Sequence, residues 1–234
     1  PTNALYRNLG GFRFVDVTAE SKVGDTGYGL GVAVSDYDND GQPDLFCNNF
    51  GPNVLYQNCG DGTFANVTKE SGAERGNDVG AGANFLDMDG DGDLDLVQGN
   101  FQQPNALFLN EGGELAQTPV WSSGPSEATR CLAIGDVDRD GDPDLVCGNH
   151  SQRNSLYRKE GGWFTEDPIW YAEQANITES VTLGDVNGDG WLDLYCGNST
   201  QQNALYLNES GRFSESPMLS NDLDQTQDVL LTDM

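Results

Sequence analysis

The segment Asp36-Tyr-Asp-Asn-Asp-Gly-Gln-Pro-Asp44 sets a pattern that recurs three more times along the chain. The other copies are Asp87-Met-Asp-Gly-Asp-Gly-Asp-Leu-Asp95, Asp136-Val-Asp-Arg-Asp-Gly-Asp-Pro-Asp144 and Asp185-Val-Asn-Gly-Asp-Gly-Trp-Leu-Asp193. Because they begin at residues 36, 87, 136 and 185, the intervals are 51, 49 and 49 residues. A period near 50 residues is typical of one propeller blade of four strands. The sequence therefore predicts a series of such blades.

The residues between these acidic segments keep the same register and have strand-like spacing. Two asparagine positions recur after every segment: Asn49, Asn100, Asn149 and Asn198, then Asn53, Asn105, Asn154 and Asn203. The apolar spacing before the third segment, in Cys131-Leu-Ala-Ile-Gly135, is strand-like rather than helical, which favours strands over helices. We predict an all-β fold, a β-propeller of four-stranded antiparallel blades with very little helix.

The domain organisation follows from counting the units. We expect one propeller domain over residues 1–234, with units at about 3–52, 53–104, 105–153, 154–202 and 203–234, the last incomplete. The chain begins at the third strand of a unit, and Asp233 aligns with the first residue of a fifth acidic segment. Two interpretations remain open: the chain is a fragment of a longer propeller, or five blades leave an open slot that a neighbouring chain fills.

The charge of the chain limits its partners. Thirty-eight acidic residues against 11 basic ones give a net charge of −27. Such a surface repels nucleic acid and anionic membranes and attracts cations. The sequence has no apolar run of about 18 residues, so we expect no membrane insertion.

The acidic segments have the composition of a calcium-binding loop. Oxygen ligands stand at positions one, three, five and nine, a glycine at position six permits a sharp turn, and residue seven offers its carbonyl. An EF-hand would need a glutamate at position twelve, where the chain has cysteine or glutamine. We predict about four Ca²⁺ sites of a structural kind, the fourth weakest because it has Asn187 in place of aspartate. The candidate ligands are Asp36, Asp38, Asp40, Gln42, Asp44, Asp87, Asp89, Asp91, Asp93, Asp95, Asp136, Asp138, Asp140, Asp142, Asp144, Asp185, Asn187, Asp189, Trp191 and Asp193.

The remaining reactive side chains do not form a catalytic pattern. Cys47, Cys147 and Cys196 share one repeat position and are predicted to be buried thiols, with a Cys131–Cys147 disulfide as an alternative. The single histidine, His150, is expected in a solvated turn. No serine or cysteine has a partner base in a nucleophile motif. We therefore expect no enzymatic activity.

The repeats resemble FG-GAP or VCBS-type calcium propeller repeats, found in integrin α heads and in many secreted bacterial proteins. Runs such as Asn3-Ala-Leu-Tyr-Arg-Asn8 are similar to those of the cartilage acidic protein branch, whose members are extracellular. The resemblance covers essentially the whole chain. It implies calcium loops between the first and second strands of each blade, seven blades in many relatives, and a secreted or cell-surface location.

Several functions remain compatible with this resemblance. The first is an extracellular structural or adhesive module that binds a protein or glycan of the cell surface or matrix, or assembles with itself through the incomplete blade. The second is a carbohydrate-binding propeller that uses Trp121, Trp163, Trp170 or Trp191 to stack on sugars. The third is a non-catalytic propeller of a larger secreted enzyme.

Overall fold

The computed structural model describes residues 3–73 and 80–231, and the regular secondary structure there consists almost wholly of antiparallel strands. The only helix in this part of the chain is α1 (Thr18–Ser21), and no helix there is long and apolar enough to cross a membrane. The predicted fold class, blades of antiparallel strands, is thereby confirmed. The chain divides into two compact units, residues 1–98 with 107–120 and residues 99–106 with 121–234. Each unit is described by itself below.

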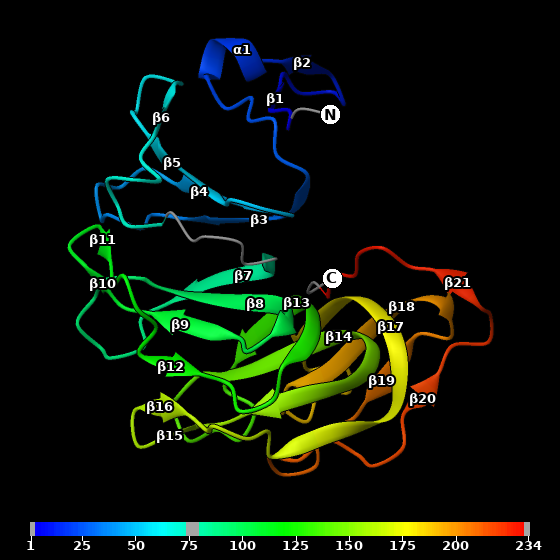
Figure 1. The fold of residues 1–234 in the computed structure, drawn as a ribbon. Coiled ribbons are helices and arrows are strands. Elements are labelled where there is room, and N and C mark those ends of the chain that lie inside the picture. Colours follow the sequence, from blue (N-terminus) through cyan, green and yellow to red (C-terminus); the bar gives the residue numbers. More distant parts are fainter. Residues whose placement is uncertain (1–2, 74–79, 232–234) are drawn as a thin grey trace. The chain divides into compact units, whose positions relative to one another are not determined.

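The first unit contains one complete four-stranded blade, in the order β3-β4-β5-β6 (Figure 1). Its antiparallel register pairs Val32 with Cys47 and Leu45 with Tyr56. We call this sheet the first blade. The strands of the unit are β1 (Tyr6–Asn8), β2 (Phe14–Asp16), β3 (Gly29–Ser35), β4 (Asp44–Asn49), β5 (Val54–Asn58), β6 (Phe64–Asn66), β7 (Gly80–Leu86), β10 (Asn110–Glu111) and β11 (Glu114–Leu115). The division between the units falls within β8 (Asp95–Gln103) and β9 (Ala106–Phe108), which with β7 belong to the second blade.

The second unit holds the third and fourth blades, and one long strand, β17, runs from the third into the fourth (Figure 1). Leu156 of β14 pairs with Trp170 at the start of β17, in the third blade, whereas Leu183 at the end of β17 pairs with Leu194 of β18, in the fourth. One continuous strand is therefore the outer strand of one blade and the first strand of the next. The strands of this unit are β12 (Trp121–Ser122), β13 (Glu127–Gly135), β14 (Asp144–Tyr157), β15 (Lys159–Glu160), β16 (Trp163–Phe164), β17 (Trp170–Gly184), β18 (Asp193–Gln201), β19 (Ala204–Tyr206), β20 (Met218–Leu219) and β21 (Asp224–Gln225).

The second strand of each blade is buried on both faces. The six residues that open β14, Asp144 to Asn149, are all buried, and β18 begins with the same kind of segment. A strand that packs on both faces needs a continuous apolar run, which explains why Leu145-Val-Cys147 does not alternate with polar residues. Cys47, Cys147 and Cys196 lie in these strands and are buried as predicted. All five cysteines are free, so the alternative Cys131–Cys147 disulfide is not formed.

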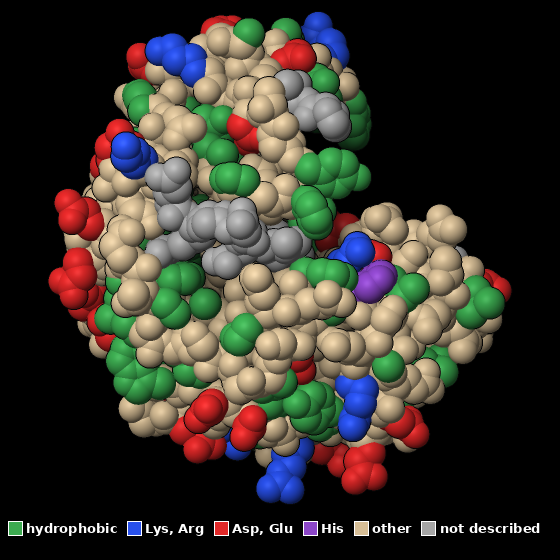
Figure 2. Space-filling view, viewed as in Figure 1, with side chains coloured by type: hydrophobic (Ala, Val, Ile, Leu, Met, Phe, Trp, Pro, Cys, Tyr) green, Lys and Arg blue, Asp and Glu red, His purple; other side chains and the backbone are tan. Residues whose placement is uncertain are grey.

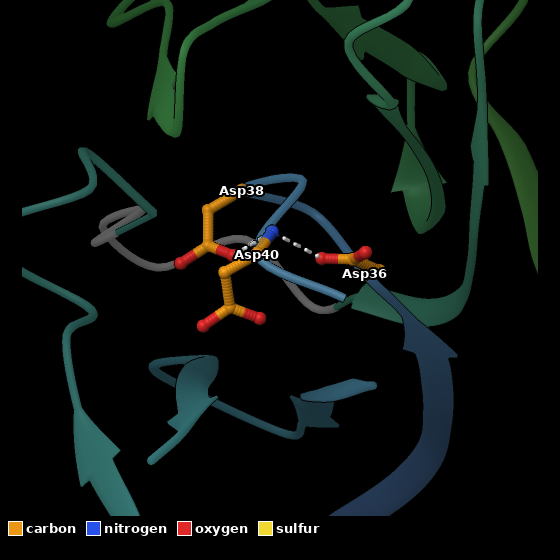
Figure 3. A group of neighbouring side chains, drawn as sticks. All are labelled: Asp36, Asp38 and Asp40. Atoms are coloured by element: carbon orange, nitrogen blue, oxygen red, sulfur yellow. Dashed lines mark hydrogen bonds between the residues drawn. The ribbon is translucent and has the colours of Figure 1, made fainter. Parts of the chain in front are cut away.

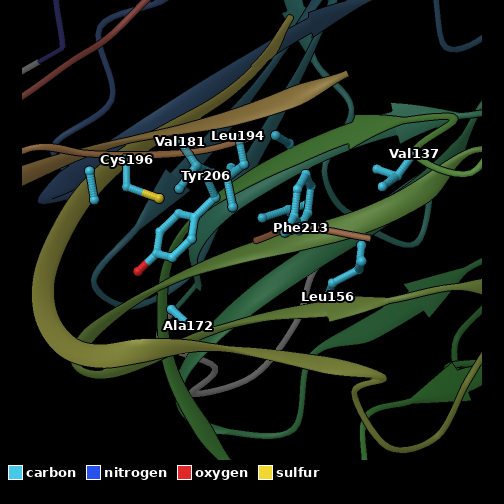
Figure 4. Close-up of a cluster of buried hydrophobic side chains, with 11 residues drawn as sticks. Val137, Leu156, Ala172, Val181, Leu194, Cys196, Tyr206 and Phe213 are labelled. Carbon is cyan, nitrogen blue, oxygen red and sulfur yellow. The ribbon is translucent and has the colours of Figure 1, made fainter. Parts of the chain in front are cut away.

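The core of the second unit lies around a group of large side chains from β14, β17, β18 and β19 (Figure 4). Tyr206 and Leu194 are almost completely buried there, together with Phe213. Trp170 packs edge-on against Tyr206 and Phe213, with ring centroids 5.1 and 5.2 Å away. Trp121 packs in the same way against Tyr157 and Phe164. Each aromatic pair adds about 0.5–1.5 kcal/mol beyond area burial, so the outer-strand tryptophans join one blade to the next.

Candidate metal sites in the repeated loops

The four acidic segments form loops that join the first strand of a blade to its second strand. They connect β3 to β4, β7 to β8, β13 to β14 and β17 to β18, and in each case position nine is the first residue of the second strand. The sixth residue has a left-handed backbone, with φ of 87° at Gly41 and 97° at Gly141. Glycine adopts this conformation without steric cost, so the loop can turn sharply back toward its own start.

The turn gathers the acidic side chains of the first loop around one point (Figure 3). The Asp36 carboxylate accepts hydrogen bonds from the backbone N–H groups of Asp40 at 3.0 Å and Gly41 at 2.9 Å. Ligand oxygens of Asp36, Asp38 and Asp40 lie within 4.8 Å of one another. Two further loops form groups from positions one, three and nine instead: Asp87 with Asp89 and Asp95, and Asp136 with Asp138 and Asp144.

The aspartate at position nine anchors each loop to the sheet. Asp44 accepts hydrogen bonds from the backbone N–H of Tyr37 at 3.1 Å and of Asn58 at 2.7 Å, one on each carboxylate oxygen. Asp95, Asp144 and Asp193 accept the equivalent pairs of bonds. All four side chains are buried, and burial raises the pKa of Asp44, Asp95 and Asp144 to about 6, because the charged form is kept from water.

The donor set fits a hard cation. The clustered side chains offer carboxylate oxygens, the ligands that Ca²⁺ prefers, and one member of the second and third groups is a buried carboxylate held by backbone donors alone. Like charges at this spacing repel one another unless a cation lies between them. In the fourth loop Asn187 replaces the aspartate at position three, and its Oδ1 accepts a hydrogen bond from the backbone N–H of Asp189 at 2.9 Å.

The comparisons with known proteins agree with this geometry. A family model described as "FG-GAP-like repeat" matches residues 1–47, 36–98, 87–147, 136–196 and 185–234, which together span the chain. The chain belongs to the FG-GAP-like repeat family. Each match runs from one acidic loop to the next or to a chain end, so consecutive matches overlap at the loops. The loops therefore mark the boundaries between repeats.

This FG-GAP-repeat chain is similar in sequence to cartilage acidic protein 1 of several vertebrates. It is 42% identical over 82 residues to cartilage acidic protein 1 of Xenopus tropicalis, and 38% identical over 95 residues to that of Homo sapiens. These alignments cover 35% and 40% of the chain but only 13% and 14% of the relatives, so the chain matches a small part of their length.

Solved structures of low identity share the fold. A crystal structure titled as BBS1N in complex with ARL6DN superposes with a TM-score of 0.57 at 10% identity, over 84% of this chain and 59% of that one. An Agrocybe aegerita lectin, described as recognising non-reducing terminal N-acetylglucosamine, has a TM-score of 0.55 at 20% identity, over 94% and 60% of the two chains. At these identities the likeness shows the fold alone.

The seventh loop residues of this FG-GAP-repeat chain contact their surroundings through their side chains. Asp93 accepts a hydrogen bond from Asn39 Nδ2 at 2.7 Å, Asp142 pairs with Lys159, and the Trp191 ring lies 4.5 Å from the Arg139 guanidinium. In both compact units, position four of one loop thus contacts position seven of the following loop. The proposed carbonyl ligands at these positions, and at Gln42, remain a prediction.

The repeated asparagines, to which the sequence analysis assigned no role, bond to each other where the second strand of a blade passes into the third, whether the two strands are separate or continuous as in β14. The backbone N–H of Asn149 donates to Asn154 Oδ1 at 2.9 Å, and Asn149 Nδ2 donates to the carbonyl of Arg153 at 2.8 Å. The same two bonds occur at Asn49, Asn100 and Asn198. We call each such asparagine pair an asparagine clamp. The clamps lie outside the acidic loops, so they shape the sheet rather than the metal loops.

The sequence analysis misplaced the histidine and missed two basic residues that contact the third loop. His150 lies within β14, is half-buried and has its ring 6.0 Å from that of Phe101, so the prediction of a solvated turn histidine is wrong. The loop contacts of Arg158 and Lys159 were not predicted. Arg158 Nε lies 2.8 Å from Asp138 Oδ2, and Lys159 Nζ lies 2.9 Å from Asp142 Oδ1.

Proposed function

We propose that this chain is a non-catalytic, calcium-stabilised extracellular module that associates through an uncovered face of its first blade. The observation that carries the proposal is the exposure of β3. Val32 and Val34 are 60% and 61% exposed, whereas Val181, which holds the register position of Val32 in the fourth blade, is 7% exposed. The face lines a groove of about 440 Å³ with Leu5, Val23, Leu45 and Cys47.

The nature of the partner follows from the other blades. In the second unit, Val181 packs beside Gly148, a residue of the second strand of the preceding blade. Val32 has the same position in its own blade, so its face suits another apolar strand surface. We propose that a second copy of this chain supplies that surface, since an exposed apolar strand is a natural site for association.

The experiment is light scattering of the purified protein in millimolar calcium, backed by electron microscopy. Defined oligomers are expected, and the Val32→Asp, Val34→Asp double variant is expected to be monomeric. The matched control is Val186→Asp, a similarly exposed valine in the fourth loop, which should leave the oligomers intact. A wild-type protein that stays monomeric at all concentrations would refute self-association.

Calcium stabilisation is tested separately by melting. A ligand bound only by the folded state stabilises it by mass action, so a chelator should lower the melting temperature. At a free concentration of about 100 times the dissociation constant, the stabilisation per site is about 2.7 kcal/mol. An unchanged melting temperature would contradict the calcium part of the proposal.

A carbohydrate-binding role is the second candidate, favoured by the fold shared with the Agrocybe aegerita lectin. Trp121 and Trp170 are engaged in packing between blades, and Trp191 lies against Arg139. Trp163 is the tryptophan with an exposed ring surface, at 39%. Binding to a glycan panel that disappears in Trp163→Ala would favour this alternative.

A further inference from the structure

Two basic side chains lie against the third loop. In the sequence, both residues follow directly after β14. Arg158 and Lys159 follow the end of β14 at Tyr157. The Arg158 guanidinium forms an ion pair with Asp138, at loop position three, and the Lys159 ammonium forms one with Asp142, at position seven. Both separations, 2.8 and 2.9 Å, are those of a close charge pair.

These cations are held in place by the surrounding fold. The side chain of Lys159 is 9% exposed and that of Arg158 is 23% exposed. The backbone N–H of Lys159 donates to Asp144 Oδ1 at 3.0 Å, and Arg158 Nη2 donates to the carbonyl of Gly211 at 3.0 Å. Because they are partly buried, both pairs are less screened by salt than surface pairs are.

The other three blades have no cation at the register positions of Arg158 and Lys159. The register positions of Arg158 and Lys159 hold Gln57 and Asn58 in the first blade, Leu109 and Asn110 in the second, and Leu207 and Asn208 in the fourth. Among the described residues, the ion pairs that involve loop carboxylates are those of the third loop alone. Gln57 takes a related place, since its Nε2 donates to Asp38 Oδ2, but it has no charge.

The second and third loops therefore differ in charge although their acidic residues match. Each contains five aspartates, which gives −5 for residues 87–95. In the third loop the adjacent Arg158 and Lys159 reduce −5 to −3. The guanidinium of Arg139, itself a third-loop residue, lies over the ring of Trp191 in the fourth loop and pairs with no carboxylate in the described part of the chain. At position three, Asp138 also has both carboxylate oxygens engaged, because Oδ1 accepts a hydrogen bond from the backbone N–H of Asp140 at 3.3 Å.

We propose that Arg158 and Lys159 act as built-in counter-ions of the third loop, so that this loop is ordered without calcium and binds calcium most weakly of the four. The inference rests on the proposed calcium binding of the other loops. A calcium ion in the third loop must displace the guanidinium from Asp138 or bind beside two positive charges. The proposal therefore gives the third loop a lower calcium affinity than the fourth. The replacement of aspartate by Asn187, taken alone, would make the fourth loop the weakest site.

The test is hydrogen exchange of the whole protein, in millimolar calcium and in chelator, resolved by loop. Loops one, two and four should lose backbone protection when calcium is removed, and the third loop should keep it. Equal loss of protection in the second and third loops would overturn the inference. No loss in any loop would instead refute the proposed calcium binding, so the two failures are distinguishable.

A pair of variants sharpens the test. Arg158→Leu with Lys159→Asn gives the third blade the residues of the fourth, and Arg158→Gln copies the first blade in case the double variant folds poorly. Protection of the third loop should then depend on calcium, and its calcium affinity should rise by about tenfold or more, since unit charges beside the site are removed. Arg130→Leu removes a charge that pairs with Glu179 instead, and should leave the loop unchanged. A third loop that stays calcium-independent in both variants would also overturn the inference.

Discussion

The asparagine clamps of the first and third blades share the hydrogen bond between their two asparagines but differ in the bonds to neighbouring strands. In the third blade, Asn149 Oδ1 accepts a hydrogen bond from Thr129 Oγ1 at 2.9 Å, and Asn154 Nδ2 donates to Cys196 Sγ, in the next blade, at 3.3 Å. In the first blade, Asn49 Oδ1 and Asn53 Nδ2 are buried and have no hydrogen-bond partner within residues 3–73 and 80–231. The first blade has Gly29 at the position of Thr129, so no hydroxyl is available there.

This difference separates the hydrogen bonds that a repeat forms within itself from those that depend on a neighbouring strand or repeat. The bonds within the clamp join residues four or five positions apart and occur in every blade. The outer bonds need a threonine on the first strand or a thiol in the following repeat. A buried polar group left without a partner costs about 1–3 kcal/mol, so the first blade is the less well satisfied copy.

The largest effect is expected where the second strands differ beside the clamp. At this position the third blade has Gly148 and the first has Asn48. A Cβ on Gly148 would lie 2.9 Å from Val181 Cγ1 and 3.1 Å from Thr178 Cγ2, so Gly148→Ala should destabilise the protein by about 2–3 kcal/mol through overpacking. Chemical denaturation would measure the change.

The same replacement residue should act in the opposite direction in the first blade. Asn48 is fully buried, and both polar atoms of its side chain lack a partner. Asn48→Ala removes both, and we expect a gain of about 1 kcal/mol after the cost of the small cavity. Destabilisation of equal size at both positions would show that the two second strands are equivalent.

A smaller difference between the first and third blades is expected from the clamps themselves. Asn154→Ala removes the acceptor of the Asn149 N–H and the donor to Cys196, and should cost about 2–3 kcal/mol. Asn53→Ala also removes the acceptor of a backbone N–H, that of Asn49. Because it eliminates a buried, unpaired Nδ2 as well, its cost should be only about 1 kcal/mol. Asn105→Ala, which loses a bond to Cys147, serves as the control and should behave like Asn154→Ala. Similar losses at residues 53 and 154 would contradict the comparison.

The smallest effect concerns pH and a glutamate of the third blade. Glu127 is buried and accepts hydrogen bonds from Ser155 Oγ at 2.7 Å and Tyr157 OH at 3.1 Å, and burial raises its pKa above the usual 4.5. The folded state then binds the proton more tightly than the unfolded chain does. Its contribution to stability is therefore fully present below pH 4.5 and declines as the pH rises through the folded-state pKa.

The matched variant is Glu127→Gln, which cannot ionise. It should melt at the same temperature as wild type in acid, and at a higher temperature near neutral pH. The first blade has Gly27 at this register position, so Gly27 offers no such titration. A difference between the two proteins that does not change with pH would refute the assignment.

The sequence predicted the blades and the loops because both depend on residues close together in the chain. The period of the aspartates, the sixth-position glycines and the apolar run around Cys147 are all visible within single repeats. The bond from Asn105 to Cys147 joins residues 42 positions apart, and Arg158 reaches a loop aspartate 20 positions earlier. Such contacts follow only from the packing of strands and blades. His150 was misplaced for a related reason, since the turn predicted there is part of the continuous strand β14.

The strand β17 has a consequence for how such a protein can grow. Because it belongs to the third blade at Trp170 and to the fourth at Leu183, a gene segment cut at the edge of a blade would divide it. A segment cut from the start of one acidic loop to the start of the next, such as residues 136–184, keeps the strand whole and carries an outer strand already joined to the first strand of its successor. Duplicating that segment lengthens the array by one blade and leaves every sheet with matching edges.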